Sequence, residues 1–316
     1  MLGIVIPAYK RKDCLRKTLQ SLVLQTKQSF YVVVVDDHSP EPLKDVVDEF
    51  KWKLHIKYIY AEQNGGPGVA RQIGLNYCYE KNFDYVIFLD SDDLLYPQAV
   101  ARLDYEAQLS KSDIVSSGFW IEGKETGGRR VTEKNKTFVH GKIYNIDFLK
   151  RNDITFPDLR VNEDLCFNLK AFGLAQNIKY LDETLHLFCQ EPSSITRNGE
   201  NGYNLSADHI ESIYLATIFL VEKGEIPDWI IVNILNCYNH CQKTQILGNG
   251  LSKERKKHMS WLLNLDKIQF ALKEREVCNR LVGLIEQMAF INGEFITFPQ
   301  TFKDWLEEYI DGNSNN

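Results

Sequence analysis

Residues 85–97, YVIFLDSDDLLYP, join an apolar run to three acids that have one serine among them. The apolar part is typical of a buried strand, and Asp90, Asp92 and Asp93 follow at its carboxyl end. Three carboxylates so close together repel one another unless a cation lies between them. Oxygen ligands without a nearby His or Cys suit a hard ion, Mg²⁺ or Mn²⁺. A cap of the following helix is the simpler interpretation, but it accounts for one acid and not for three.

Upstream of this stretch, short apolar runs alternate with segments of helical spacing. The runs at residues 2–6, 31–35 and about 55–60 predict strands, with helices between them. The run YVVVV is apolar throughout, which is typical of a strand buried on both faces. This alternation predicts an α/β fold with a parallel sheet and right-handed crossovers.

Three sets of residues, most of them polar, follow the carboxyl ends of predicted strands. They are Pro7, Ala8 and Tyr9 after the first strand, Asp36 and Asp37 after the second, and the acids at 90–93 after the fourth. Open parallel sheets bind ligands beyond the carboxyl ends of their strands. We therefore expect the three sets to converge on one edge of the sheet.

Two segments near this edge allow both a structural and a ligand-binding interpretation. Asp37 could form an Asx turn or accept hydrogen bonds from a nucleotide base or ribose. The sequence NGGPG at 64–68 resembles a phosphate-binding loop but lacks the GxxxxGK[ST] pattern. A helix start with Pro67 in its first turn is the favoured interpretation, and Arg71 is kept as a phosphate or base contact.

The pattern is less regular after residue 112. Strands are predicted at 112–120 and 136–144, a short helix at 146–150, and an amphipathic helix at 161–173 with Gly173 as its C-cap. Glu163 and Asp164 lie in the first turn of the last helix. Their interaction with the helix dipole is a complete structural explanation, and a general base is the functional one, so both remain open.

Composition and charge exclude some classes of protein. The chain is 44% hydrophobic with a net charge of −6, which is ordinary for a globular protein and argues against a nucleic-acid coat. The basic clusters at 10–12, 129–130 and 253–258 are interpreted as solvated surface. Seven cysteines and a strand that begins at residue 2 predict a reduced, cytoplasmic protein without a signal peptide. No apolar run has the length of a membrane span.

Seven stretches, in one order, resemble a family-2 glycosyltransferase of the GT-A fold. They are IVIPAYKRKDCLRKTLQSLVLQT, VVVVDDHSP, NGGPGVARQIGLN, FLDSDD, HGKIYNIDFLK, FPDLRVNEDLCFNLK and EPSSITR, and they cover residues 2 to about 197. The resemblance implies a Rossmann-like, mostly parallel sheet flanked by helices. It also implies inverting transfer of a sugar from a nucleotide-sugar, most often a UDP-sugar, to an acceptor hydroxyl.

This resemblance predicts the division of the chain. Residues 1–200 would form the catalytic domain, with a nucleotide-sugar-binding half at 1–112 and an acceptor-side half at 113–200. Residues 203–312 are expected to be an α-helical C-terminal region that resembles no named family. The last four residues, 313–316, are expected to be disordered.

The resemblance also assigns roles to single residues. Asp164, the acid of the family's ED pair, would be the catalytic base, and Asp92 of the DxD motif would hold Mn²⁺ or Mg²⁺. The residues expected to contact the nucleotide-sugar are Pro7, Ala8, Tyr9, Asp37, Arg71, Asp90 and Ser91. Trp120 and Glu163 are expected on the acceptor side, and Asp93 is assigned only to the turn into the next helix.

One motif departs from the family pattern. A YRxH-like stretch often ends the catalytic region, and here its arginine is Cys189 and its histidine is Glu191. Glu191 is kept as a metal ligand, because a carboxylate also binds hard cations. The missing arginine puts the usual contact with the diphosphate in question. His186 could substitute for it, but a histidine between Leu185 and Leu187 on a strand favours a structural interpretation.

Other activities are weighed beside a glycosyltransferase. Nucleotidyltransferases share the sheet but usually carry a Gly-rich loop after the first strand, and PAYKRKD has no glycine. A non-catalytic binding module is the third interpretation, against which the retained Asp92 and Asp164 argue. The expected acceptor is a saccharide, free or on a lipid carrier at a membrane surface. Modified DNA is the minority alternative, which the acidic net charge opposes.

Overall fold

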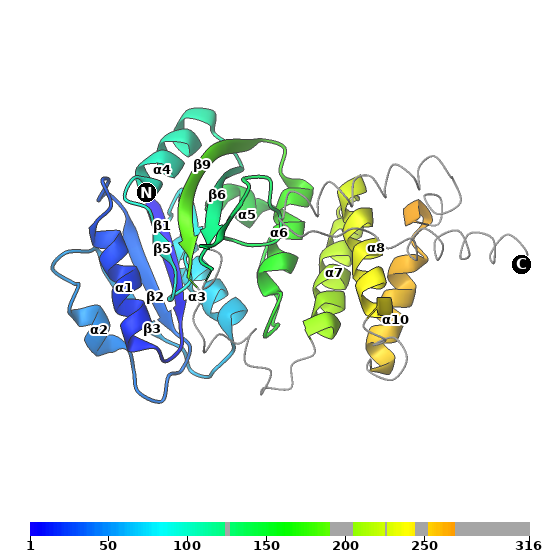
Figure 1. Cartoon of the computed structure of the whole chain (residues 1–316), viewed down its shortest axis with the longest axis horizontal. Coiled ribbons are helices and arrows are strands. Elements are labelled where there is room, and N and C mark those ends of the chain that lie inside the picture. Colours follow the sequence, from blue (N-terminus) through cyan, green and yellow to red (C-terminus); the bar gives the residue numbers. More distant parts are fainter. Residues whose placement is uncertain (124–126, 190–204, 225, 244–251, 269–316) are drawn as a thin grey trace, which may run out of the picture. The chain divides into compact units, whose positions relative to one another are not determined.

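The computed structural model describes residues 1–123, 127–189, 205–224, 226–243 and 252–268 (Figure 1). The chain divides into two compact units, Met1–Tyr203 and Asn204–Asn316. Among the described residues, no helix is both long enough and apolar enough to cross a membrane.

A mixed sheet forms the centre of the first unit, with strand order β3-β2-β1-β4-β8-β6-β9-β5 and β7 paired to β6. The strands are β1 (Leu2–Ala8), β2 (Tyr31–Asp36), β3 (Ile56–Tyr60), β4 (Tyr85–Phe88), β5 (Leu94–Leu95), β6 (Ile114–Ile121), β7 (Arg129–Val131), β8 (Lys142–Asn145) and β9 (Ile178–Phe188). The four strands β3, β2, β1 and β4 are parallel, as their apolar runs predict. Beyond β4 the pairing is antiparallel except between β6 and β9.

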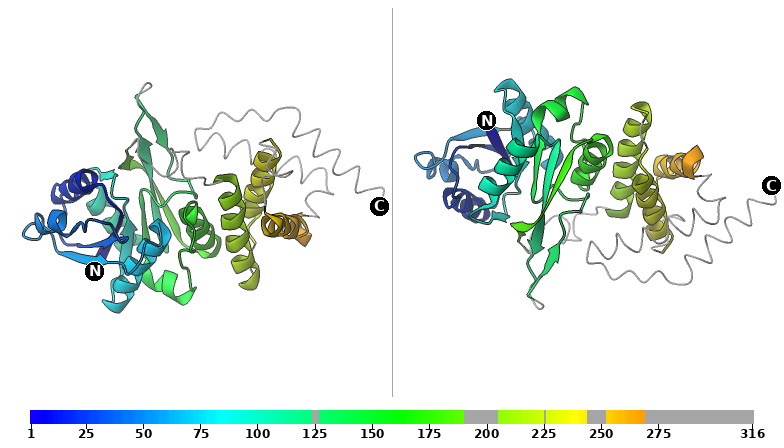
Figure 2. Two further views of the ribbon diagram at one scale, coloured as in Figure 1. Left: turned by 90° about the horizontal axis from the view of Figure 1, so that it is seen from below. Right: turned by 90° about the horizontal axis from the view of Figure 1, so that it is seen from above.

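Helices pack on both sides of this sheet, as two further views show (Figure 2). Those of the first unit are α1 (Lys12–Val23), α2 (Lys44–Asp48), α3 (Pro67–Glu80), α4 (Ala99–Ser110), α5 (Ile146–Arg151) and α6 (Glu163–Leu174). Alternate side chains of β1, from Leu2 to Ala8, join one buried core with residues of α1 and α4. On the opposite side of β1, a Cβ at Gly74 of α3 would lie 2.3 Å from Cγ1 of Val5. The glycine therefore permits the close packing of α3 on the sheet.

Two local predictions were wrong. The strand expected at 136–144 is confined to β8, because Oδ1 of Asn135 accepts hydrogen bonds from the amides of Thr137 and Phe138 and forms a turn there. Gly173 lies inside α6, which continues to Leu174, and is not its C-cap. The predicted helix start at NGGPG is confirmed, since Gly66 has φ +87° and Pro67 begins α3.

The second unit contains α7 (Leu205–Glu222), α8 (Asp228–Lys243) and α10 (Lys253–Leu263). Arg255 of α10 forms an ion pair with Asp208 of α7 at 2.6 Å, and the His258 ring stacks on Tyr214. The basic cluster at 253–258 was predicted to be solvated surface, and this was wrong for Arg255 and His258. Both face α7 because they lie three residues apart on one side of a helix.

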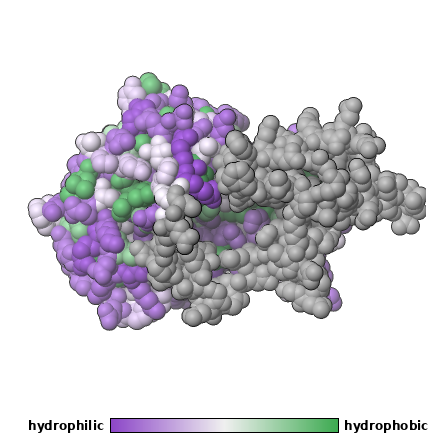
Figure 3. All heavy atoms as spheres, in the orientation of Figure 1, coloured by the Kyte–Doolittle hydropathy of each residue, from purple (hydrophilic) through white to green (hydrophobic). Residues whose placement is uncertain are grey.

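The described surface is mostly hydrophilic on the face that Figure 3 shows. Hydrophobic side chains lie there in small separate groups. Trp52, Tyr105 and Leu109 are examples of large hydrophobic residues whose side chains are exposed. Singly exposed apolar residues are common in soluble proteins and need no partner.

Candidate active site

The carboxyl ends of β1, β2 and β4 lie side by side and bring the predicted polar sets to one edge. Ala8 is in register with Asp36, and Val5 with Phe88, so the chain leaves all three strands at the same edge of the sheet. Pro7 and Ala8 are buried there, whereas the Tyr9 side chain is exposed. The convergence follows from parallel pairing of neighbouring strands.

The two acids after β2 have different partners. Asp36 is fully buried and accepts hydrogen bonds from the amides of Ser39 and Leu43 and from the Tyr58 hydroxyl. Asp37 binds the NGGPG loop, because its two oxygens accept the amides of Gly65 and Gly66, each at 2.8 Å. Burial raises the pKa of Asp37, although these two amide bonds oppose the shift.

Arg71 connects the acids after β4 with the acids at the start of α6. Its side chain is 3% exposed, and its terminal nitrogens donate to Oδ1 of Asp90 and to Oε1 of Glu163, each at 2.5 Å. Among the described residues its Nε has no hydrogen-bond partner. One guanidinium therefore joins two segments that lie 73 positions apart in the sequence, from 90 to 163.

Burial and mutual repulsion set the pKa values of these acids. Burial acts to raise the pKa of Asp90, but the charge and hydrogen bond of Arg71, together with His140 and His186, outweigh it and the pKa is lowered. Burial raises the pKa of Glu163 against the same guanidinium. Burial and the negative charge of Glu163 raise the pKa of Asp164 to about 7. The Asp164 side chain is partly exposed, so it combines access with a pKa near neutrality.

Asp92 is paired with Arg11, a residue that was predicted to be solvated surface. Nη1 of Arg11 donates to Oδ2 of Asp92 at 2.7 Å, and both side chains are largely buried. Lys10 and Arg11 both have left-handed backbone conformations, with φ of 58° and 56°. Burial and repulsion from Asp93 and Asp90 raise the pKa of Asp92 to about 7. A cation at Asp92 would offset this repulsion, so the oxygen donors fit a hard metal ion.

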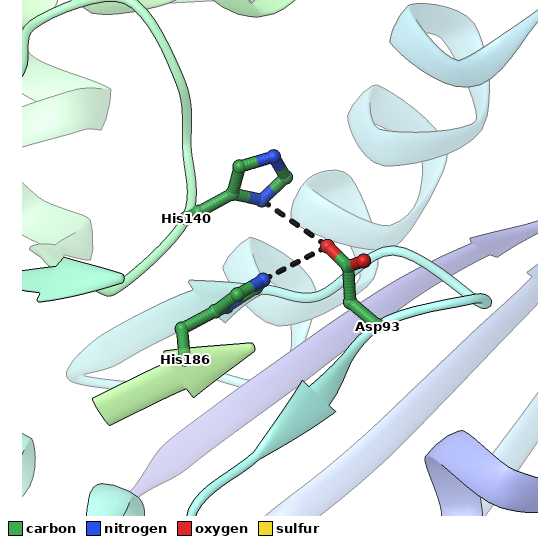
Figure 4. Close-up of side chains that lie close together, drawn as sticks. All are labelled: Asp93, His140 and His186. Carbon is green, nitrogen blue, oxygen red and sulfur yellow. Dashed lines mark hydrogen bonds and ion pairs between the residues drawn. The ribbon is translucent and has the colours of Figure 1, made fainter. Parts of the chain in front are cut away.

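Asp93 does more than form a turn. It is fully buried, and the rings of His140 and His186 both point to its Oδ2, at 3.4 and 2.8 Å (Figure 4). Its Oδ1 accepts the amide of Cys189 at 3.0 Å. Among the described residues, these three side chains are the group of His, Cys, Asp and Glu donors that is close enough to hold a metal ion. Asp92, the predicted ligand, is not part of that group.

Lys142 is a buried cation that the sequence reasoning missed. Its Nζ donates to the carbonyl oxygens of Phe138 at 2.6 Å and His140 at 3.3 Å. Burial lowers its pKa to about 7, although the Asp164 charge opposes the shift. A lysine in the middle of HGKIYN, between a turn and a buried strand, is the only signal of it in the sequence.

Three further residues were predicted for the site: Ser91, Trp120 and Glu191. Ser91 lies in the turn between Asp90 and Asp92, and Trp120 lies near the end of β6 opposite Arg130. Glu191 lies outside the described residues, as does the stretch EPSSITR.

The chain is similar to known proteins of one family. The family model described as "Glycosyl transferase family 2" matches residues 3–168. The chain is 28% identical to the uncharacterized glycosyltransferase EpsJ of Bacillus subtilis over 86% of each protein. It is 29% identical to the poly(ribitol-phosphate) β-N-acetylglucosaminyltransferase TarS of Staphylococcus aureus, over 79% of this chain but 44% of that protein.

Solved structures show the same fold. The crystal structure of S. aureus TarS 1–349 in complex with UDP-GlcNAc superposes with a TM-score of 0.65 and 22% sequence identity. The match covers 94% of this chain and 93% of that one. A mannosyltransferase from Pyrobaculum calidifontis in complex with GDP-Man and Mn²⁺ has a TM-score of 0.51.

Proposed function

The chain belongs to glycosyltransferase family 2 and has the GT-A fold, and from this premise we propose that it transfers a sugar from a UDP-sugar to an acceptor hydroxyl with inversion. The family prediction made from the seven stretches is confirmed. Beyond the family, we propose a UDP-sugar donor, inversion at the anomeric carbon, a metal requirement and the roles of single residues.

The bridge formed by Arg71 carries the proposal. It binds Asp90 of the DxD motif and Glu163 of the ED pair at the same time, so the two acidic motifs form one site. Glycosyl transfer with inversion needs a charge-stabilising group at the leaving diphosphate and a base at the opposite face of the sugar. An acidic motif that would hold a divalent cation, linked through Arg71 to a second acidic motif that would supply the base, would meet that requirement.

The turn with Asp90 and Asp92 is the proposed donor side. Asp92 would hold a divalent cation, Mn²⁺ or Mg²⁺. When bound, this cation would act as a Lewis acid that stabilises the negative charge of the leaving diphosphate. Arg11 lies at the same carboxylate, so its guanidinium is placed to bind a phosphate oxygen of the donor. It would supply the positive charge that the family's arginine gives at the position of Cys189.

Asp164 is the proposed general base. Its carboxylate would take the proton from the acceptor hydroxyl while the hydroxyl oxygen bonds to the anomeric carbon. The bond from that carbon to the diphosphate oxygen breaks on the opposite face, and UDP leaves. A pKa of about 7 suits a base that must be ionised in the ground state and still bind a proton during the reaction.

Relatives guide the choice of substrates. TarS is named as a β-N-acetylglucosaminyltransferase and a relative in Bacillus spizizenii as a β-glucosyltransferase, both of poly(ribitol-phosphate). The TarS structure contains UDP-GlcNAc. We therefore propose UDP-GlcNAc and UDP-glucose as the first donors to test, with a saccharide-type acceptor that offers free hydroxyl groups.

Release of UDP from a panel of nucleotide-sugars, with and without Mn²⁺, tests the proposal. We expect metal-stimulated hydrolysis of one UDP-sugar, and we expect Asp92→Asn to abolish metal-dependent UDP binding. Asp48→Asn, at an exposed ion pair with Lys44, is the matched control and should behave as wild type. Failure of every nucleotide-sugar to bind or turn over would exclude this activity, and pyrophosphate release from UTP and a sugar phosphate would indicate a nucleotidyltransferase.

A further inference from the structure

We propose that Asp93, His140 and His186 form a second metal site, distinct from the donor site, which holds a borderline divalent transition-metal ion such as Zn²⁺. The three donors come from separate parts of the first unit. Asp93 precedes β5, His140 lies in the turn before β8, and His186 belongs to β9. Their ligand atoms all lie within 4.8 Å of one another.

One of the ligand pairs already has the spacing expected around a shared ion. Zinc bonds of about 2.0–2.1 Å in a tetrahedron place neighbouring ligand atoms about 3.3 Å apart. Nδ1 of His140 lies 3.4 Å from Oδ2 of Asp93, which is close to that value. Nε2 of His186 lies 2.8 Å from the same oxygen, so this pair would have to open by about half an ångström.

The hydrogen bonding of His140 also favours an ion. Its side chain is 3% exposed, and within the part of the chain that the structure describes its Nδ1 has no hydrogen-bond partner. The ring nonetheless points at a carboxylate oxygen (Figure 4). Burying a polar nitrogen without a partner costs about 1–3 kcal/mol, and a metal bond would remove this cost.

The chemistry of the ligand atoms distinguishes this site from the proposed nucleotide-sugar site at Asp92. Two imidazole nitrogens and one carboxylate suit zinc and related ions, whereas oxygen ligands suit Mg²⁺ and Mn²⁺. All three side chains are buried, while Asp92 is partly exposed. An ion here would therefore have a structural role. It would tie the turn that carries Asp92 to β9 and leave a fourth position for water.

The metal content of the purified full chain tests the proposal. The wild type is first washed with a chelator too weak to remove a tightly bound ion. Elemental mass spectrometry should then find about one zinc ion per chain. After complete stripping, Zn²⁺ alone should raise the Tm by about 5 °C or more. His140→Gln should lose the ion and the Tm shift, and His55→Gln, at an exposed position, should keep both.

Two further outcomes are decisive. Asp92→Asn should keep the zinc ion, because the proposed ligands are intact, and loss of zinc in that variant would place the ion at the donor site instead. A wild type without bound metal and with a Tm that Zn²⁺ does not change would mean that only the contacts of Asp93 with His140 and His186 hold the cluster together. These measurements need no enzymatic activity, so they stand apart from the test of the glycosyltransferase.

Discussion

At the scale of single residues, three acids in one turn have three different partners. Asp90 binds Arg71, Asp92 binds Arg11, and Asp93 binds His186, with sequence separations of 19, 81 and 93 positions. In the sequence the three differ only in position. The turn points each carboxylate toward a different element, and the long-range partner then gives each one its own charge environment.

Asp164→Asn should lower kcat by about 10²- to 10⁴-fold and leave donor binding nearly unchanged, because it removes the base and not a donor contact. In the wild type, kcat should rise as the pH increases through about 7, where the Asp164 carboxyl loses its proton. The variant should lack this limb of the profile. Rate against pH and the Kd of UDP measure the two effects, with Glu80→Gln as an exposed control. Weakened donor binding with normal transfer would contradict this role.

Arg11→Ala should have opposite effects on the metal and on the donor. Without the guanidinium, Asp92 meets no competing charge at this point, so Mn²⁺ alone should bind several-fold more tightly. The KM of the donor should rise about tenfold, since one charged contact with phosphate is lost. Calorimetry and kinetics measure these changes, and Arg16→Ala, at a surface pair with Glu49, is the control. Equal weakening of both would mean that Arg11 only shapes its loop.

Asp92→Asn should change how stability depends on pH in the absence of metal. The folded pKa of about 7 exceeds the unfolded value of 3.8, so the folded wild type binds the proton more tightly. The free energy of unfolding therefore falls as the pH rises from about 4 to about 7. Between pH 5 and 8 the variant should gain about 1–2 kcal/mol relative to the wild type. Urea denaturation of both proteins at these two pH values measures the free energy of unfolding. An equal change with pH in the wild type and the variant would refute the raised pKa.

At the scale of elements, α3 holds the end of β4 and the start of α6 together through Arg71. The helical period predicted α3 and α6, and the apolar run predicted β4. Nothing in those patterns places the Arg71 side chain between Asp90 and Glu163. The consequence is an ion triad in which the buried Arg71 pairs with the buried Glu163 and the partly buried Asp90, so one charge stabilises two carboxylates at once.

Arg71→Met should destabilise the protein by about 3–5 kcal/mol, because it leaves the buried Glu163 and the partly buried Asp90 without their partner. Adding Glu163→Gln should recover part of this, about 1–2 kcal/mol, because one of the two charges is then removed. Transfer should stay low in both variants, since the two acidic motifs lose their link. Denaturant unfolding and kcat measure the cycle, and Arg16→Met should cost less than about 1 kcal/mol. Strictly additive losses would show that Arg71 and Glu163 are not coupled.

At the scale of the whole molecule, the chain has two units with separate cores. The core of the first unit contains strands β1, β2 and β4 with α1 and α4, and the second unit packs α7 against α8 and α10. The acids proposed for catalysis belong to the first unit. We therefore propose that the second unit serves acceptor choice.

A chain that ends at Tyr203 should fold and hydrolyse the donor, because it keeps the sheet and both acidic motifs. It should lose transfer to the acceptor that the full-length protein uses. UDP release with and without acceptor measures both activities, with circular dichroism as the check of folding. Full transfer by the shortened chain would place acceptor choice in the first unit, and an unfolded product would show that the units depend on each other.

The sequence by itself determined the family, the parallel half of the sheet and the acids at its edge. The hydrophobic period and the alternation of strands with helices are properties of short segments, so they can be read from neighbouring residues. Only the tertiary structure decided which partner each charged residue has. Arg11, predicted to be solvated surface, pairs with Asp92, and Asp93 contacts His140 and His186. Such pairs depend on contacts of about 3 Å between segments far apart in the chain, whereas a sequence pattern specifies a side chain only to one face of an element.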